Sequence, residues 1–105
     1  MTKPEITQQE LIRGKLNSET ARMPWKELQR YFAGGYTLVV GTQLDLIEVA
    51  YQFNIDNAAQ IEQWLNDELI QQVSNDQARA WYNNDAQLWT CVVKPWVLMQ
   101  PEPDD

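Results

Sequence analysis

The sequence contains no histidine. This absence excludes Ser-His-Asp and Cys-His catalysis, and acid–base chemistry by imidazole, within one chain. Typical zinc sites are excluded as well, because they need histidine or several cysteines and Cys91 is the only cysteine. Neither standard phosphate-binding loop, G-x-x-x-x-G-K-[ST] or G-x-G-x-x-G, occurs. The sequence therefore carries no recognisable catalytic set, and we expect no enzymatic activity and no cofactor.

A single cysteine cannot form an internal disulfide, so an oxidising compartment is not implied. Cys91 lies in the most apolar segment, where we expect a buried, unreactive thiol. The N-terminus, MTKPEITQQELIRGK, lacks the apolar region of a secretory signal. No apolar run approaches the roughly 18–20 residues that span a bilayer. We therefore expect a cytoplasmic protein that does not bind membranes.

Positive charge is scarce: eight Lys and Arg stand against fifteen Asp and Glu, for a net charge of −7. Residues 1–30 hold six basic and four acidic side chains, a net charge of +2, so the remaining residues carry −9. An acidic body argues against binding of nucleic acids or anionic membranes. It fits an ordinary soluble surface, a docking surface for a basic partner, or mimicry of a nucleic acid.

The chain has the size and apolar content of one domain. Its 105 residues, 44% of them hydrophobic, suffice for a core without metal or disulfides. We expect a single domain over residues 1–105, with an ordered core at about residues 7–100 and frayed ends.

Capping signals predict four helices. A T-Q-Q-E capping box at Thr7 begins the first helix, which ends or bends before Pro24. Pro24 then suits the first position of a second helix. Asp56 or Asn57 caps a third helix, and an S-N-D-Q capping box at Ser74 begins a fourth.

Apolar patterns predict the strands. Residues 36–40 fit a strand, and residues 47–53 alternate with period two, so the two are expected to form a hairpin. A helix over residues 46–51 is the competing interpretation, since short apolar runs are ambiguous. Residues 88–93 are apolar on both faces, which is typical of a central strand covered on both sides. Pro95 interrupts pairing there, and residues 96–99 continue in extended form.

These elements follow the order α-α-β-β-α-α-β and predict the α+β class. We expect a small, mainly antiparallel sheet of about three strands, with the C-terminal strand central, packed against about four helices. The sequence leaves open which of the first two strands pairs with the last.

Carboxylates are the remaining candidates for chemistry. Asp45 and Glu48 are close in sequence, and paired carboxylates bind Mg²⁺ or act as acid and base. Exposed Asp and Glu more often solvate a surface, and no calcium-loop spacing is present. We therefore assign no metal site and no catalytic residue.

Five tryptophans in so short a chain are unusual, and all five fall at positions assigned to inner faces. Most are expected in the core, but Trp and Arg are also the residues most often found at binding hot spots. Trp96 is a candidate interface residue because it follows the Pro that interrupts the sheet. Arg22 and Trp25, three residues apart at a helix junction, form a second candidate pair, although Arg22 also fits a salt bridge at a helix end.

Several segments together resemble a known family: LNSETARMPWKELQRYFAGG (16–35), LDLIEVA (44–50), DNAAQIEQWL (56–65), VSNDQARAWYNNDAQLW (73–89) and VVKPWVLMQ (92–100). The chain resembles a family of short bacterial proteins catalogued as a domain of unknown function. The resemblance implies a small, stand-alone bacterial cytoplasmic protein. It supplies no activity, cofactor or site residue.

Three functions remain open from the sequence. The first is a non-enzymatic protein-interaction module, with another protein or a second copy of the chain as its partner. The second is a small-ligand binding protein or an accessory subunit of an enzyme complex, which would need a concave pocket lined by Trp. The third is an acidic nucleic-acid mimic, which would need one continuous stripe of carboxylates.

Overall fold

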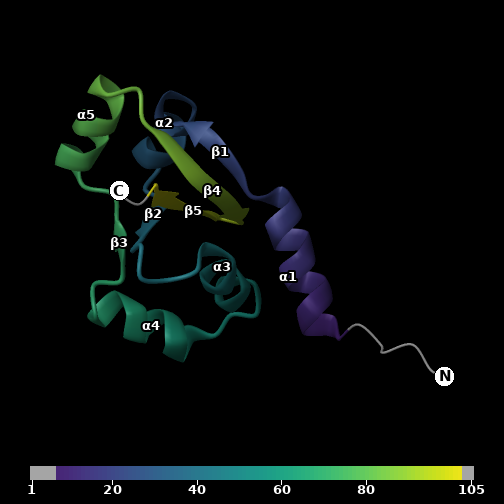
Figure 1. Cartoon of the computed structure of the whole chain (residues 1–105). Coiled ribbons are helices and arrows are strands. Elements are labelled where there is room, and N and C mark those ends of the chain that lie inside the picture. The colour runs from purple at the N-terminus through teal and green to yellow at the C-terminus, as the bar shows by residue number, and fades with distance from the viewer. Residues whose placement is uncertain (1–6, 103–105) are drawn as a thin grey trace.

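A computed structural model describes residues 7–102 of the chain. In this part of the chain, five helices and five strands follow one another (Figure 1). The helices are α1 (Gln8–Glu19), α2 (Trp25–Ala33), α3 (Leu46–Asn54), α4 (Ala58–Asn66) and α5 (Asn75–Asn83). The strands are β1 (Ala21–Pro24), β2 (Thr37–Val40), β3 (Ile70–Gln72), β4 (Gln87–Val93) and β5 (Trp96–Pro101).

The strands form one sheet in the order β1-β4-β5-β2-β3. β4 and β5 are antiparallel and joined by the two-residue turn of Lys94 and Pro95, whose peptide bond is cis. β5 pairs in parallel with β2, while β1 and β3 add antiparallel edges. The α+β class and the mainly antiparallel sheet are therefore confirmed. The predicted central strand, residues 88–93, is β4 and lies beside the central strand; residues 96–99 do not continue it but turn back as β5, which takes the central position.

Helices cover both faces of the sheet and create two cores (Figure 1). The first core joins the sheet to α1, α3 and α4, and the second joins it to α2 and α5. Successive side chains of a strand point to opposite faces. Accordingly Leu38 and Val40 of β2 belong to the first core, and Val39 between them belongs to the second.

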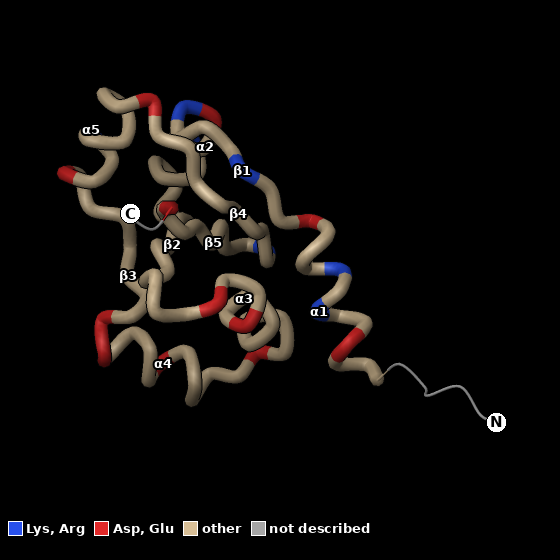
Figure 2. The backbone as a smooth tube through the Cα atoms, in the orientation of Figure 1, with Lys and Arg blue, Asp and Glu red and all other residues tan. Residues whose placement is uncertain are grey.

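Charge is distributed unevenly over these layers. Between Arg30 and Arg79 the chain has seven carboxylates and no lysine or arginine. Figure 2 shows the result as acidic positions along α3 and α4 without basic ones, whereas basic positions lie on α1, β1 and α2. The segment that contains α3 and α4 therefore carries negative charge and no positive charge.

The predicted strand over residues 47–53 is wrong, and the competing helix is correct. This segment is α3, whose N-cap Asp45 accepts a hydrogen bond from the Ile47 amide at 2.9 Å. Leu46, Val49 and Ala50 are its buried residues, at the i, i+3 and i+4 spacing of a helix stripe. The apolar residues of this segment fit both the period of a strand and that of a helix. The N-cap hydrogen bond of Asp45 distinguishes the helix. The predicted hairpin with residues 36–40 therefore does not form.

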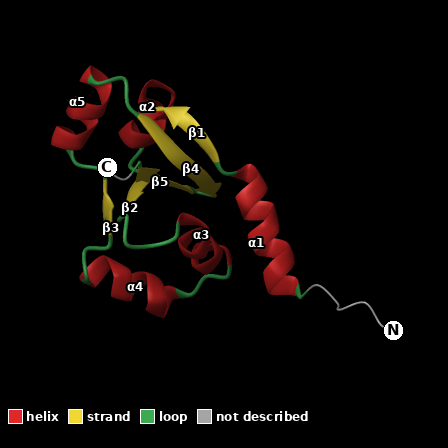
Figure 3. Cartoon of the chain, in the orientation of Figure 1, coloured by secondary structure: helices red, strands yellow, loops and turns green. Residues whose placement is uncertain are grey.

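The predicted counts of about three strands and four helices are too low, since the described residues contain five of each (Figure 3). α3 is the additional helix, while β1 and β3 are edge strands of four and three residues without an alternating pattern of their own. β4 is also not covered on both faces as predicted, because Trp89 and Val92 are exposed. Trp89 pairs with Arg22 of the short edge strand β1, and Val92 lies beyond the end of β1, whose pairing reaches only Thr90.

The predicted helix boundaries agree with the structure at several points. Thr7 caps α1 by accepting from the Glu10 amide, and Asn57 rather than Asp56 caps α4. Ser74 and Gln77 form the complete capping box of α5. No helix within residues 7–102 has the length and apolarity needed to cross a membrane.

Because β5 is the central strand, we expect a large loss of stability when one of its buried side chains is truncated. Leu98 of β5 is fully buried in the first core, so Leu98→Ala should lower the free energy of unfolding by about 2–5 kcal/mol. Leu11 of α1 is 54% exposed, and Leu11→Ala should cost less than about 0.5 kcal/mol. Urea unfolding of both variants measures the difference. Equal losses would contradict the assignment of Leu98 to the core.

Candidate functional site

The three residues selected from the sequence as interface candidates lie in different environments. Arg22 is exposed on β1, and Trp96 is half-buried at the start of β5. Trp25 is only 1% exposed and packs edge-on against Phe32 and Trp81, with ring centroids 5.5 and 5.2 Å away. The prediction of Trp25 as an interface residue is therefore corrected. Trp25 is the first residue of α2, and its side chain is buried in the second core.

Arg22 instead has a different tryptophan beside it. In the β1–β4 ladder Arg22 lies directly opposite Trp89, and its guanidinium carbon is 6.0 Å from the centroid of the indole ring. The Arg22 Nε donates to Glu102 Oε1 at 2.9 Å, which holds the side chain at the sheet edge. Trp89 is 40% exposed. A cation and a large aromatic ring thus share one exposed patch of the sheet.

A hollow of about 390 Å³ adjoins Trp89. The end of α1, the start of α3 and the strands β4 and β5 border it. Gln100 shapes this site, because its side-chain amide donates to the Gly41 and Leu44 carbonyls and so fixes the loop that leads into α3. We call Arg22 together with the hollow the Arg22–Trp89 surface; the residues that line the hollow are Asn17, Thr20, Asp45, Leu46, Ile47, Trp89 and Gln100.

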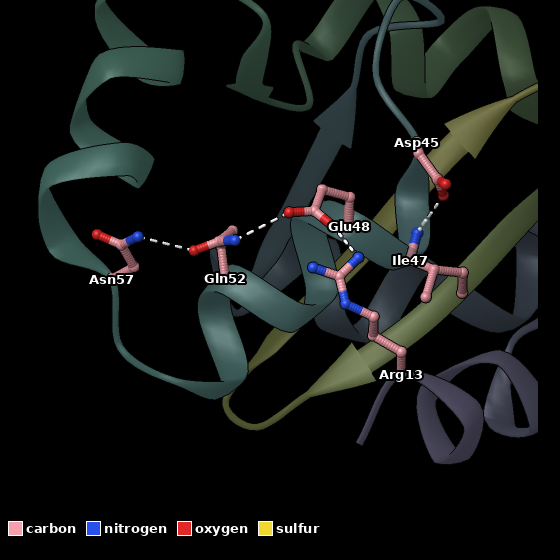
Figure 4. Close-up of polar contacts among 6 residues, drawn as sticks. All are labelled: Arg13, Asp45, Ile47, Glu48, Gln52 and Asn57. Atoms are coloured by element: carbon pink, nitrogen blue, oxygen red, sulfur yellow. Dashed lines mark hydrogen bonds and ion pairs between the residues drawn. The ribbon is translucent and has the colours of Figure 1, made fainter. Parts of the chain in front are cut away.

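The two carboxylates considered for metal binding are both engaged within the chain (Figure 4). Asp45 caps α3 through the Ile47 amide. Glu48 accepts from Arg13 of α1 and from the Gln52 side chain. Within the described residues, no three Asp, Glu or Cys side chains are grouped so as to hold a metal ion. In this arrangement both carboxylates stabilise helices.

Glu48 is the centre of a polar chain that links three helices. Asn57 donates to Gln52, Gln52 donates to Glu48, and Arg13 completes the chain from α1 (Figure 4). Arg13 also lies over the Tyr51 ring, 4.4 Å from its centroid. The hydrogen bond from Gln52 lowers the pKa of Glu48 below its ordinary value; burial opposes this and Arg13 adds to it. The network therefore fixes α1, α3 and α4 relative to one another.

A second hollow, of about 410 Å³, lies beneath the β4–β5 turn, between the end of α3 and α4. Phe53 and Trp96 line it together, with ring centroids 6.5 Å apart and planes at 65°. We call it the Phe53–Trp96 pocket. Its other apolar residues are Leu38, Ala58, Ile61, Leu65, Val93 and Pro95, and its polar ones are Asp56, Glu62, Gln72 and Lys94.

The cysteine and the two serines, the side chains that could act as nucleophiles, have structural roles. Cys91 is fully buried in the first core, which confirms its expected burial, and burial raises the pKa of its thiol. Ser18 donates to the Lys15 carbonyl within α1, and Ser74 caps α5. None of these three side chains faces a basic partner that would activate it.

Comparison with known proteins agrees with this geometry. Residues 11–101 match the model of the family described as Protein of unknown function (DUF2288). The chain belongs to this family. The NMR solution structure of PA1075 from Pseudomonas aeruginosa is 36% identical over 97% of this chain and 95% of that chain, with a TM-score of 0.77. No curated protein matches the chain.

In this DUF2288 member, sequence reasoning missed two residues of the candidate sites, Trp89 and Phe53. Trp89 was assigned to the core because residues 88–93 are uniformly apolar, so no polar alternation revealed an uncovered face. Its pairing with Arg22 requires β1, which the sequence did not predict. Phe53 was assigned to a strand, whereas the helix α3 places it beside Trp96. The sequence feature that could have indicated the helix, and with it the position of Phe53, is the N-cap residue Asp45.

The Glu48 network predicts a pH-dependent stability. Because the pKa of Glu48 is lowered by folding, its ionised form adds stability above the ordinary value, and this is lost as the pH falls through the folded pKa. Glu48→Gln should therefore destabilise the protein most at about pH 7 and progressively less towards about pH 3. Urea unfolding across this range measures the difference. Glu62→Gln, an exposed change on α4, is the control; a Glu48→Gln effect that does not shrink in acid would contradict the prediction.

Proposed function

We propose that this chain is a non-enzymatic protein-interaction module of a bacterial cytoplasm, which binds a protein partner or a second copy of itself through the Arg22–Trp89 surface. The observation that carries the proposal is the 40% exposure of Trp89 with Arg22 opposite it. Tryptophan and arginine are the residues most enriched at binding hot spots, and exposed aromatic surface gains free energy when a partner covers it.

The hollow beside Trp89 supports the same function. Its lining combines the apolar residues Leu46, Ile47 and Trp89 with polar residues such as Asn17 and Asp45, so a partner would contact apolar and polar groups together. Interfaces commonly have this composition, with an apolar centre and a polar rim. The Gln100 bonds to the loop before α3 make the surface rigid in advance of binding, which lowers the entropy cost of association.

A non-catalytic role is supported by what the side chains already do. Cys91 is buried, Ser74 caps a helix, and Asp45 caps another. These three side chains, which could otherwise take part in catalysis, have structural roles here, and histidine is absent from the sequence.

Self-association is tested by light scattering after size exclusion over a range of concentrations. The wild type should show a concentration-dependent mass above that of the monomer. Arg22→Ala and Trp89→Thr should weaken association, with the tryptophan change costing about 2 kcal/mol or more, roughly 30-fold in affinity. Thr suits a strand position, so the variant should keep the fold, which circular dichroism checks.

Tyr82→Ser is the matched control, because Tyr82 is also an exposed aromatic residue, 48% against 40% for Trp89, and lies on α5 outside this surface. A wild type that stays monomeric at all concentrations would exclude the second copy as partner. Quantitative co-purification from the host then compares the same variants. Proteins retained equally by wild type, Trp89→Thr and Tyr82→Ser would contradict the Arg22–Trp89 surface as the contact site.

A second candidate function, small-ligand binding or an accessory role in an enzyme complex, is favoured by the Phe53–Trp96 pocket. Its volume of about 410 Å³ and its apolar walls with a few polar groups are typical of ligand sites. A ligand that fits should raise the melting temperature of the wild type and not that of Trp96→Ala. Equal shifts in both proteins would place binding elsewhere.

The nucleic-acid mimic is the weakest of the three functions. Mimicry requires a continuous stripe of carboxylates, but the acidic residues lie on several elements (Figure 2). Four of them, Glu48, Asp76, Asp85 and Glu102, are paired with Arg13, Arg79, Lys26 and Arg22.

A further inference from the structure

The Phe53–Trp96 pocket has the chemistry of a site for a positively charged group. Two aromatic rings line it at a steep angle, and aromatic faces attract cations such as alkylated ammonium groups. Ile61, Leu65 and Val93 supply aliphatic walls for an apolar body. The pocket therefore offers one wall to hydrocarbon and another to a cation.

Two carboxylates at the pocket strengthen this preference. Asp56 and Glu62 line it, and neither forms an ion pair within residues 7–102. Lys94 is the only cationic side chain in the lining, so the carboxylates outnumber it. The α3–α4 segment, which carries acidic and no basic positions (Figure 2), borders the pocket on one side and adds a negative potential that attracts cations and repels anions.

The position of Asp56 is set by the backbone. Asp56 has a φ of 56° in the turn between α3 and α4, the left-handed conformation that Asp and Asn adopt more readily than other non-glycine residues. Its amide donates to the Phe53 carbonyl at 3.2 Å, and its own carbonyl accepts from the Ala58 amide at 2.8 Å. The carboxylate is thus carried by a tightly bonded turn directly after Phe53.

We propose that the Phe53–Trp96 pocket binds a small organic cation, an ammonium group attached to an apolar body. The volume of about 410 Å³ suits a small molecule and lies in the range of about 300–1,000 Å³ common for ligand sites. This inference specifies the ligand class for the second candidate function and is independent of the Arg22–Trp89 surface. The apolar body contacts the aliphatic wall, and the ammonium group lies near Asp56, Glu62 and the aromatic rings.

Three probes with the same apolar body and different charge test the inference: 3-phenylpropylammonium, 3-phenylpropan-1-ol and 3-phenylpropanoate. Each is titrated into labelled full-length protein and followed by NMR, with the Trp96 indole signal assigned by its loss in Trp96→Phe. The cation should bind about tenfold or more tightly than the alcohol, and the carboxylate should bind most weakly. Shifts should centre on Phe53, Trp96 and the α3–α4 turn.

The double variant Asp56→Asn, Glu62→Gln should lose the preference for the cation and keep the affinity for the alcohol. Asn tolerates the left-handed backbone at position 56, so this variant should fold. The matched control is Glu27→Gln, Asp76→Asn, which removes the same charge from α2 and α5 on the other face of the sheet and should retain the preference.

The outcomes separate the ligand class from the ligand site. Equal binding of cation and alcohol would overturn the cation assignment and leave the pocket as a ligand site. Loss of preference in the control pair as well would also overturn it, because the effect would then come from net charge. No binding of any probe, or shifts remote from Trp96, would overturn both the inference and the small-ligand function without touching the Arg22–Trp89 surface.

Discussion

The insertion of β5 between β4 and β2 is the constraint on which the rest of this structure depends. β5 is the last strand in the chain, yet it pairs on one side with its hairpin partner and on the other, in parallel, with a strand some sixty residues earlier. Its buried side chains alternate between the two cores, with Leu98 in the first and Val97 and Met99 in the second. Gln100 then bonds the loop that begins α3. Without β5 the sheet would divide into two separate pairs of strands.

Both candidate binding sites lie on the hairpin that this insertion positions. Trp89 is on β4, towards the edge strand β1, and Trp96 is at the start of β5 beside the turn. The sites use opposite chemistry: the Arg22–Trp89 surface carries a cation, whereas Asp56 and Glu62 give the Phe53–Trp96 pocket negative charge. The Glu48 network fixes α3 and α4 around the pocket. The same sheet and helices thus present two candidate surfaces of different charge.

Much of the fold followed from local signals, and the errors have physical causes. The helix caps at Thr7 and Ser74 and the apolar strands at residues 36–40 and 88–93 could be predicted because each depends on neighbouring residues. α3 was misread because its apolar residues fit both period two and a helix stripe. β1 and β3 exist through pairing with β4 and β2 across the sheet, which no local pattern encodes. The candidate sites could be predicted least well from the sequence. The contact of Arg22 with Trp89 depends on β1, and that of Phe53 with Trp96 depends on α3.

Native-state hydrogen exchange of β5 tests the central role of this strand most directly. The amides of Val97, Leu98 and Met99 should exchange only through global unfolding, with an opening free energy equal to that measured by urea unfolding. The amides of the edge strands β1 and β3 should open at lower free energy, because each is paired on one side only. If the β5 amides instead opened together with the edge strands, below the free energy of global unfolding, β5 would not be the element that holds the two halves of the sheet together.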